Sequence, residues 1–197
     1  MKKNLCIFLI LIFFSHLSVG WSADFQKGLT AAQKGDFATA LSEWKPLAEL
    51  DYAPAQYNLG VMFDDGNGVV QNYKTALKWY TLAAGQGYAP AQFNLGVMFN
   101  NGDGVVQNYN SALKWYTLAA EQGYAPAQFN LGTMFYNGNG VIQDNIYAHM
   151  WWNISASNGN KNASKYREII AKTMTSTDSS SAQKLARDCV KKKYKGC

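Results

Sequence analysis

Residues 53–88 read APAQYNLGVMFDDGNGVVQNYKTALKWYTLAAGQGY, and this stretch recurs at a fixed period of 36 residues. The second copy, APAQFNLGVMFNNGDGVVQNYNSALKWYTLAAEQGY, spans 89–124 and matches the first at 29 of 36 positions. The third, APAQFNLGTMFYNGNGVIQDNIYAHMWWNISASNGN, spans 125–160 and departs from the pattern mainly in its second half. A period of this length is typical of solenoid proteins, whose repeats stack on their neighbours. We therefore expect the array, and no single residue, to carry the function.

Each copy predicts a pair of helices. In the first copy, apolar residues recur at helical spacing from Ala55 to Met62. They follow Pro54, which suits a first helical turn because its missing N–H has no partner there. The glycines of DDGNG end this helix, and Asn72 is placed to cap the N–H groups of the next one. One pair cannot bury its apolar side alone, so stacking of copies is required for stability.

The pattern resembles the Sel-one-like repeat, a relative of the tetratricopeptide repeat. The motifs that carry the resemblance are the A-x-A-Q-[YF]-N-L-G-x-M-F run, the G-x-G-V turn and the A-x-x-W-[YW] start of the second helix. The resemblance covers residues 53–160 in full and 24–52 in part, the latter as a degenerate first repeat. It implies an all-α fold, an α/α solenoid wound as a right-handed superhelix of helix-turn-helix units. It also implies a scaffold that binds a protein or an extended peptide and is not an enzyme.

Two further segments flank the repeats. Residues 1–22 combine two lysines with an apolar run of ten residues, which predicts a cleavable signal peptide too short to span a bilayer comfortably. The expected location is therefore periplasmic or secreted, with a mature chain that does not span a membrane. Residues 161–197 are expected to form a helical cap with a basic tail.

Charge is distributed unevenly along the chain. Residues 24–160 have a net charge of −4, whereas residues 161–197 carry ten Lys or Arg against three acids. The basic tail is either a solvated helix end, where lysines favour the negative pole, or a contact for anionic surfaces. Nucleic acid is not an expected partner, because the protein is expected to be exported and residues 24–160 are acidic.

The sequence offers little for catalysis or metal binding. After the predicted signal peptide only one histidine remains, His149, with no partners at the spacing of a triad or a zinc site. The glycine turns resemble calcium loops but lack the distal glutamate that such loops need. We therefore expect no cofactor, no metal and no enzymatic activity. By resemblance, two alternatives stay open: a secreted, host-directed interaction factor, or a β-lactam or penicillin-binding protein like some cysteine-rich relatives, whose repeated cysteine pairs this chain lacks.

The resemblance also implies a binding surface, because the first helix of each tetratricopeptide-like repeat lines the concave face. The residues expected near that groove are Tyr57, Asn58, Val61, Phe93, Asn94, Val97, Phe129, Asn130 and Thr133. Side-chain amides beside aromatic rings suit an extended peptide, because amides pair with backbone N–H and C=O groups. The alternative is that the asparagines bond to neighbouring helix ends inside the solenoid.

The end of the chain predicts a disulfide. Cys189 and Cys197 are the only cysteines after the signal peptide, and an oxidising compartment favours their pairing. A continuous helix would place them about 12 Å apart, beyond the roughly 7 Å that a disulfide allows between Cα atoms. A helix expected to begin near Ser181 must therefore end around residues 192–194, with Gly196 helping the chain to turn back. Free thiols, or a bond to another chain, are the alternatives.

Overall fold

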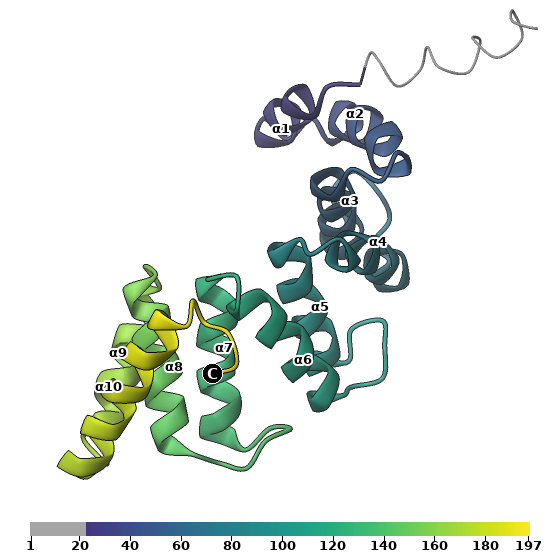
Figure 1. Ribbon diagram of the computed structural model, residues 1–197. Helices are drawn as coiled ribbons and strands as arrows, with labels where there is room; N and C mark the ends of the chain where they lie inside the picture. The colour runs from purple at the N-terminus through teal and green to yellow at the C-terminus, as the bar shows by residue number, and fades with distance from the viewer. Residues whose placement is uncertain (1–22) are drawn as a thin grey trace, which may run out of the picture.

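In the computed structural model, residues 23–197 are described, and they form ten α-helices (Figure 1). The helices are α1 (Phe25–Gln33), α2 (Phe37–Glu49), α3 (Ala53–Asp65), α4 (Tyr73–Gly85), α5 (Ala89–Asn101), α6 (Tyr109–Ala120), α7 (Ala125–Asn137), α8 (Asn145–Ser157), α9 (Lys161–Ala171) and α10 (Ser176–Lys191). The predicted signal peptide, residues 1–22, lies outside the described residues.

Successive helix pairs stack into a curved array (Figure 1). In Figure 1, α1 and α3 lie on the inner side of the curve and α2 and α4 on the outer side. Helices α5 and α7 take the place of α3 in the next two repeats, and α6 and α8 that of α4, so α1, α3, α5 and α7 are called the inner helices and α2, α4, α6 and α8 the outer helices. Helices α9 and α10 both pack against α8 and close the C-terminal end. The predicted all-α solenoid is therefore confirmed.

Local chemistry sets the ends of the repeat helices. Helix α3 carries Pro54 in its first turn and stops at Gly66, whose φ of 75° lies in the left-handed region that favours glycine. Helix α4 begins after Asn72, whose side chain accepts a hydrogen bond from the Thr75 backbone N–H at 3.0 Å, as predicted. Asn108 and Asp144 cap α6 and α8 in the same way, so each copy folds by the same local signals.

Within each pair, a glycine of the inner helix touches an aromatic ring of the outer helix. A Cβ added at Gly96 of α5 would lie 2.5 Å from the ring of Tyr116 in α6, so only glycine allows this approach. The equivalent pairs are Gly28 with Trp44, Gly60 with Tyr80, and Gly132 with Trp152. The first of these pairs places residues 24–52 in the same packing arrangement as the full repeats.

Between pairs, buried glutamines join neighbouring repeats. The Gln56 amide is fully buried; its Nε2 donates to the Ala48 carbonyl at 3.0 Å, and its Oε1 accepts from Gln86 at 2.8 Å. Gln56 therefore holds together the C-terminal ends of α2 and α4. Gln92 and Gln128 make the same two bonds at the next two junctions, to Ala84 and Gln122 and to Ala120 and Asn158. Because a buried amide is costly without hydrogen-bond partners, repeats that stack in another register would leave these amides unpaired. The glutamines therefore fix the register of the stack.

The C-terminal cap differs from the sequence-based expectation in one respect. Helix α10 begins at Ser176, five residues before the expected start near Ser181, because Thr175 caps it by accepting from the Asp178 N–H at 3.1 Å. The helix ends at Lys191, close to the expected end.

Replacing Gly96 by alanine should lower the free energy of unfolding by about 1–3 kcal/mol, because the new methyl group collides with the buried Tyr116 ring. Gly85→Ala is the matched control, since a Cβ there meets nothing within 4 Å. It should be neutral or stabilising by up to about 1 kcal/mol, the usual gain of alanine over glycine in a helix. Urea denaturation followed by circular dichroism measures both. Equal effects of the two substitutions would show that the ring contact does not constrain α5.

Candidate partner-binding site

The nine residues predicted to line a groove lie on α3, α5 and α7, in matching register. All nine are half-buried, so each presents part of its surface to solvent and part to the solenoid. These three are the inner helices of successive repeats. The structure therefore brings the three sets together along one side of the array.

Each inner aromatic residue pairs with a second ring from the following segment. The Tyr57 and Tyr88 ring centroids are 5.4 Å apart, and those of Phe93 and Tyr124 are 5.5 Å apart. Phe25 with Tyr52 (5.2 Å) and Phe129 with Tyr166 (5.3 Å) extend the series to both ends. Such tilted or edge-to-face pairs are the arrangement that aromatic rings prefer.

Sequence reasoning missed the second ring of these pairs. Tyr52, Tyr88 and Tyr124 each stand directly before an Ala-Pro pair and are the N-cap residues of α3, α5 and α7, without a side-chain capping bond. Their recurrence at this position was the available signal, since a bulky aromatic residue is not a preferred N-cap. The structure shows that these tyrosines lie against the inner rings instead.

The asparagines of the inner helices lie beside tyrosines of the preceding repeat. Burial, with smaller contributions from the neighbouring Tyr124 and Tyr88, raises the pKa of Tyr57 to about 12. The Asn94 side chain acts in the opposite direction on the pKa values of Tyr57 and Tyr80. Asn94 thus touches the junction between two repeats while one side of it remains exposed.

Asn130 repeats this arrangement one copy further on. Burial raises the pKa of Tyr116 to about 12, and the Asn130 side chain lowers it in part. Val61 and Val97 pack against the core of the next junction, and the Thr133 hydroxyl donates to the Phe129 carbonyl at 3.2 Å. The aromatic rings and the amides are therefore the members of the nine-residue set best placed to meet a partner.

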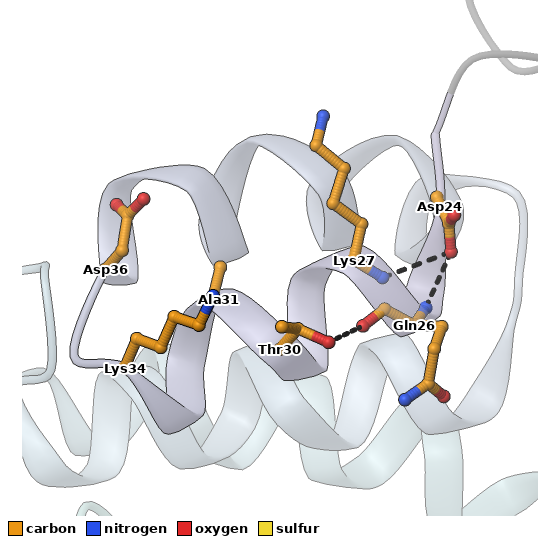
Figure 2. A pocket seen from close by; sticks show the side chains of 7 residues that line it. All are labelled: Asp24, Gln26, Lys27, Thr30, Ala31, Lys34 and Asp36. Carbon is orange, nitrogen blue, oxygen red and sulfur yellow. Dashed lines mark hydrogen bonds between the residues drawn. The ribbon is translucent and has the colours of Figure 1, made fainter.

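A shallow hollow on α1 at the N-terminal end does not look like a ligand site (Figure 2). The Asp24 carboxylate accepts from the backbone N–H groups of Gln26 and Lys27, at 2.8 and 3.1 Å. The Thr30 hydroxyl donates to the Gln26 carbonyl at 3.0 Å. The polar groups of the hollow thus serve the ends and turns of the helix itself.

The single histidine of the described chain is a packing residue. His149 of α8 is 4% exposed, and its Nδ1 has no hydrogen-bond partner among residues 23–197. Burial lowers the pKa of His149 below its usual value of 6.5, and the Arg167 guanidinium lowers it further. A neutral imidazole enclosed in this way has no route to a substrate.

Three Ser-x-x-Lys spacings, the arrangement of the nucleophile and lysine in serine β-lactamases, occur after residue 22, at Ser42, Ser111 and Ser181. Ser42 lies on an exposed face of α2, where its hydroxyl donates to the Thr39 carbonyl at 2.8 Å. Within residues 23–197 none of the three serines is hydrogen-bonded to the lysine three positions later. These spacings are therefore ordinary features of helical surfaces.

Residues 23–197 contain neither a metal-binding cluster nor a membrane-spanning helix. No group of three or more His, Cys, Asp or Glu side chains in this part of the chain is arranged to hold a metal ion. None of its helices has the length and apolar character needed to cross a bilayer.

The C-terminal loop, residues 192–197, folds back over the outer side of the array. The sulfurs of Cys189 and Cys197 are at bonding distance, 2.14 Å, with Cα atoms 5.5 Å apart. Lys193, Tyr194 and Gly196 all have positive φ, which produces the required turn. The loop is held to the ends of α6 and α8 by contacts that begin at Tyr194, whose hydroxyl meets the Asn158 side chain at 3.2 Å, and continue at Lys195, which pairs with Glu121 at 3.2 Å.

Comparison with known protein families assigns the repeat. The Sel1 repeat model matches residues 53–88, 89–124 and 125–160, which together make up more than half of the chain. The chain belongs to the Sel1 repeat family. Sel1 repeat proteins are in general non-enzymatic helical scaffolds that take part in protein–protein interactions.

Two solved structures show the same Sel1 repeat architecture. A Sel1 repeat protein from Oxalobacter formigenes is similar with 31% identity and a TM-score of 0.71, over 74% of this chain and 60% of that one. The protein c5321, a protective antigen present in uropathogenic Escherichia coli strains and displaying an SLR fold, is similar with 25% identity and a TM-score of 0.61, over 88% of this chain and 48% of that one. This chain thus spans about half to three fifths of their lengths. No curated protein matches the chain significantly.

Protein isolated from an oxidising compartment should carry a closed Cys189–Cys197 bond. Its intact mass should then be lower by two hydrogens than after reduction, and no thiol should react with an alkylating reagent before reduction. The bond closes a short loop and should contribute at most about 2–3 kcal/mol. A monomer with two alkylatable thiols, or a covalent dimer, would contradict this pairing.

The burial of His149 should make the protein less stable in mild acid. Protonation of His149 is less favourable in the folded than in the unfolded protein. The contribution of the neutral imidazole to the free energy of unfolding is therefore complete above the unfolded pKa of 6.5. That contribution is lost as the pH falls below 6.5, by at most about 1.4 kcal/mol per pH unit. The free energy of unfolding should be measured between about pH 7.5 and pH 5.5, above the titration of carboxylates. His149→Gln should show a smaller pH dependence; an unchanged dependence would exclude His149 as its source.

Proposed function

We propose that this protein is an exported Sel1 repeat scaffold that binds an extended peptide or protein segment along the inner side of α3, α5 and α7. The observation that carries the proposal is the series of inner ring pairs, Tyr57 with Tyr88 and Phe93 with Tyr124, spaced by one repeat. Half-buried rings at regular spacing offer apolar contact area with little loss of side-chain freedom on binding.

The amides beside the rings supply the polar part of recognition. Asn58, Asn94 and Asn130 are half-buried and stand next to the inner rings, one per repeat. An extended peptide exposes its backbone N–H and C=O groups at regular intervals, and a side-chain amide can pair with both. The partner is therefore expected to be an extended segment with apolar side chains.

Export is supported by two features of the chain. Residues 1–22 read as a signal peptide, and Cys189 with Cys197 would form a disulfide only in an oxidising compartment. The likeness to c5321, described as a protective antigen, favours a host-directed role as the second form of this proposal. The exposed Lys192 and Lys193 remain available for an anionic surface, whereas Lys191 pairs with Asp188 at 3.5 Å.

The inner surface is tested by replacing all three asparagines. Peptides that bind the purified protein are selected from a displayed library, and their affinity is measured by titration calorimetry. Asn58→Ala, Asn94→Ala and Asn130→Ala combined should weaken binding at least about tenfold, the loss expected for two or three net hydrogen bonds. Lys74→Ala with Asn110→Ala, at exposed positions of α4 and α6, is the control and should bind normally.

Circular dichroism of the triple variant separates binding from folding. A folded variant with weakened binding supports the inner surface. A variant that unfolds would show that the asparagines serve the solenoid itself, and a folded variant with unchanged binding would place the peptide elsewhere.

A further inference from the structure

The C-terminal loop occupies an outer surface that the fold produces more than once. We propose that the equivalent surface between α2 and α4 binds a partner protein through an exposed segment in which an aromatic residue is directly followed by lysine. This surface lies on the outer side of the array, so the proposal goes beyond peptide binding on the inner side.

The loop shows how such a segment is held between α6 and α8. The ring of Tyr194 packs against the core cluster there, and its hydroxyl meets the Asn158 side chain at 3.2 Å. Lys195 forms an ion pair with Glu121 at 3.2 Å, and the Gly196 N–H donates to the other oxygen of the same carboxylate at 3.2 Å. An apolar contact and a bidentate carboxylate thus anchor neighbouring residues of one loop.

The apolar part of this surface recurs at every junction of outer helices. Between α6 and α8, the cluster contains Leu113, Leu131, Val141 and Trp151. One repeat earlier the same places are taken by Leu77, Leu95, Val105 and Trp115, and two repeats earlier by Leu41, Leu59, Val69 and Trp79. The three junctions therefore present the same apolar side chains in the same register.

The carboxylate recurs at only one of the other two junctions. The position of Glu121 corresponds to Glu49 between α2 and α4, but to Gly85 between α4 and α6. Asp51, at the position of Gly123, adds a second acid beside Glu49. Lys45, at the position of Thr117, offsets one of these two acids, so the α2–α4 surface keeps a net negative charge, whereas the α4–α6 surface has no acid at the equivalent positions.

The tryptophans show which junctions are covered by the described chain. Trp151 is only 3% exposed beneath α10 and the loop, whereas Trp79 and Trp115 are half-buried. The Lys78 Nζ lies 5.7 Å from the centre of the Trp79 ring and the Lys114 Nζ 5.9 Å from that of Trp115, so both rings carry a cation of their own helix at one face. In Figure 1 the C-terminus lies beside α7, at the far end of the array from α2 and α4.

Binding is tested with the loop itself as the probe. A synthetic peptide of residues 187–197, RDCVKKKYKGC, is closed by its own disulfide and labelled with a fluorophore. The purified protein should bind it at one site by fluorescence anisotropy, because its own loop fills the α6–α8 surface. A scrambled peptide of equal charge, and a peptide with Tyr194→Ala, should bind at least about tenfold more weakly.

Two substitutions on the protein locate the site. Glu49→Lys, at an exposed position, should weaken binding at least about tenfold by reversing the charge opposite lysine. Gly85→Glu should create a second site between α4 and α6, since a side chain there meets nothing within 4 Å. A second binding site cannot result from unfolding of the variant.

Several results would overturn the proposal. No saturable binding, or binding unchanged by Glu49→Lys, would remove the α2–α4 surface from consideration. Binding that depends on Glu121 instead would show that the peptide displaces the protein's own loop. Self-association of the protein that Glu49→Lys abolishes would assign the surface to a second copy rather than to a separate partner.

Discussion

The close approach of a glycine to a buried aromatic ring is the constraint on which each helix pair depends. At Gly96 the backbone of α5 lies directly on the Tyr116 ring, which sets the separation of α5 and α6. Phe93 stands one turn before Gly96 on the same helix and packs on the same ring, with centroids 5.8 Å apart. The position of the inner aromatic surface is therefore set by the same contact that sets the fold.

The junctions between pairs place the second ring of that surface. Tyr88 precedes α5, yet it lies against Tyr57 of α3, so the pair exists only because the two repeats are stacked. The buried Gln56 and Gln92 amides hold this stacking in one register. A partner along the inner side would thus contact a surface that belongs to junctions as much as to repeats.

The sequence predicted the solenoid and the ends of its repeated helices because these follow from local signals repeated at a fixed period. Asn72 as a cap is an example, since it needs only the residues three positions ahead. The start of α10 was missed because the Ser- and Thr-rich run after residue 174 favours turns as well as helix starts. The contact of Lys195 with Glu121, 74 residues apart, has no local signal at all.

The repeated junctions also bear on how such a chain can change its length. Each of Gln56, Gln92 and Gln128 bonds to one carbonyl of the preceding copy and one amide of its own. Duplicating residues 89–124 would therefore add one junction with the same glutamine hydrogen bonds as the existing junctions. Both ends of the molecule would stay as they are. The junction chemistry therefore allows the number of copies to change by duplication or deletion of a whole repeat, and the length of the array changes with it.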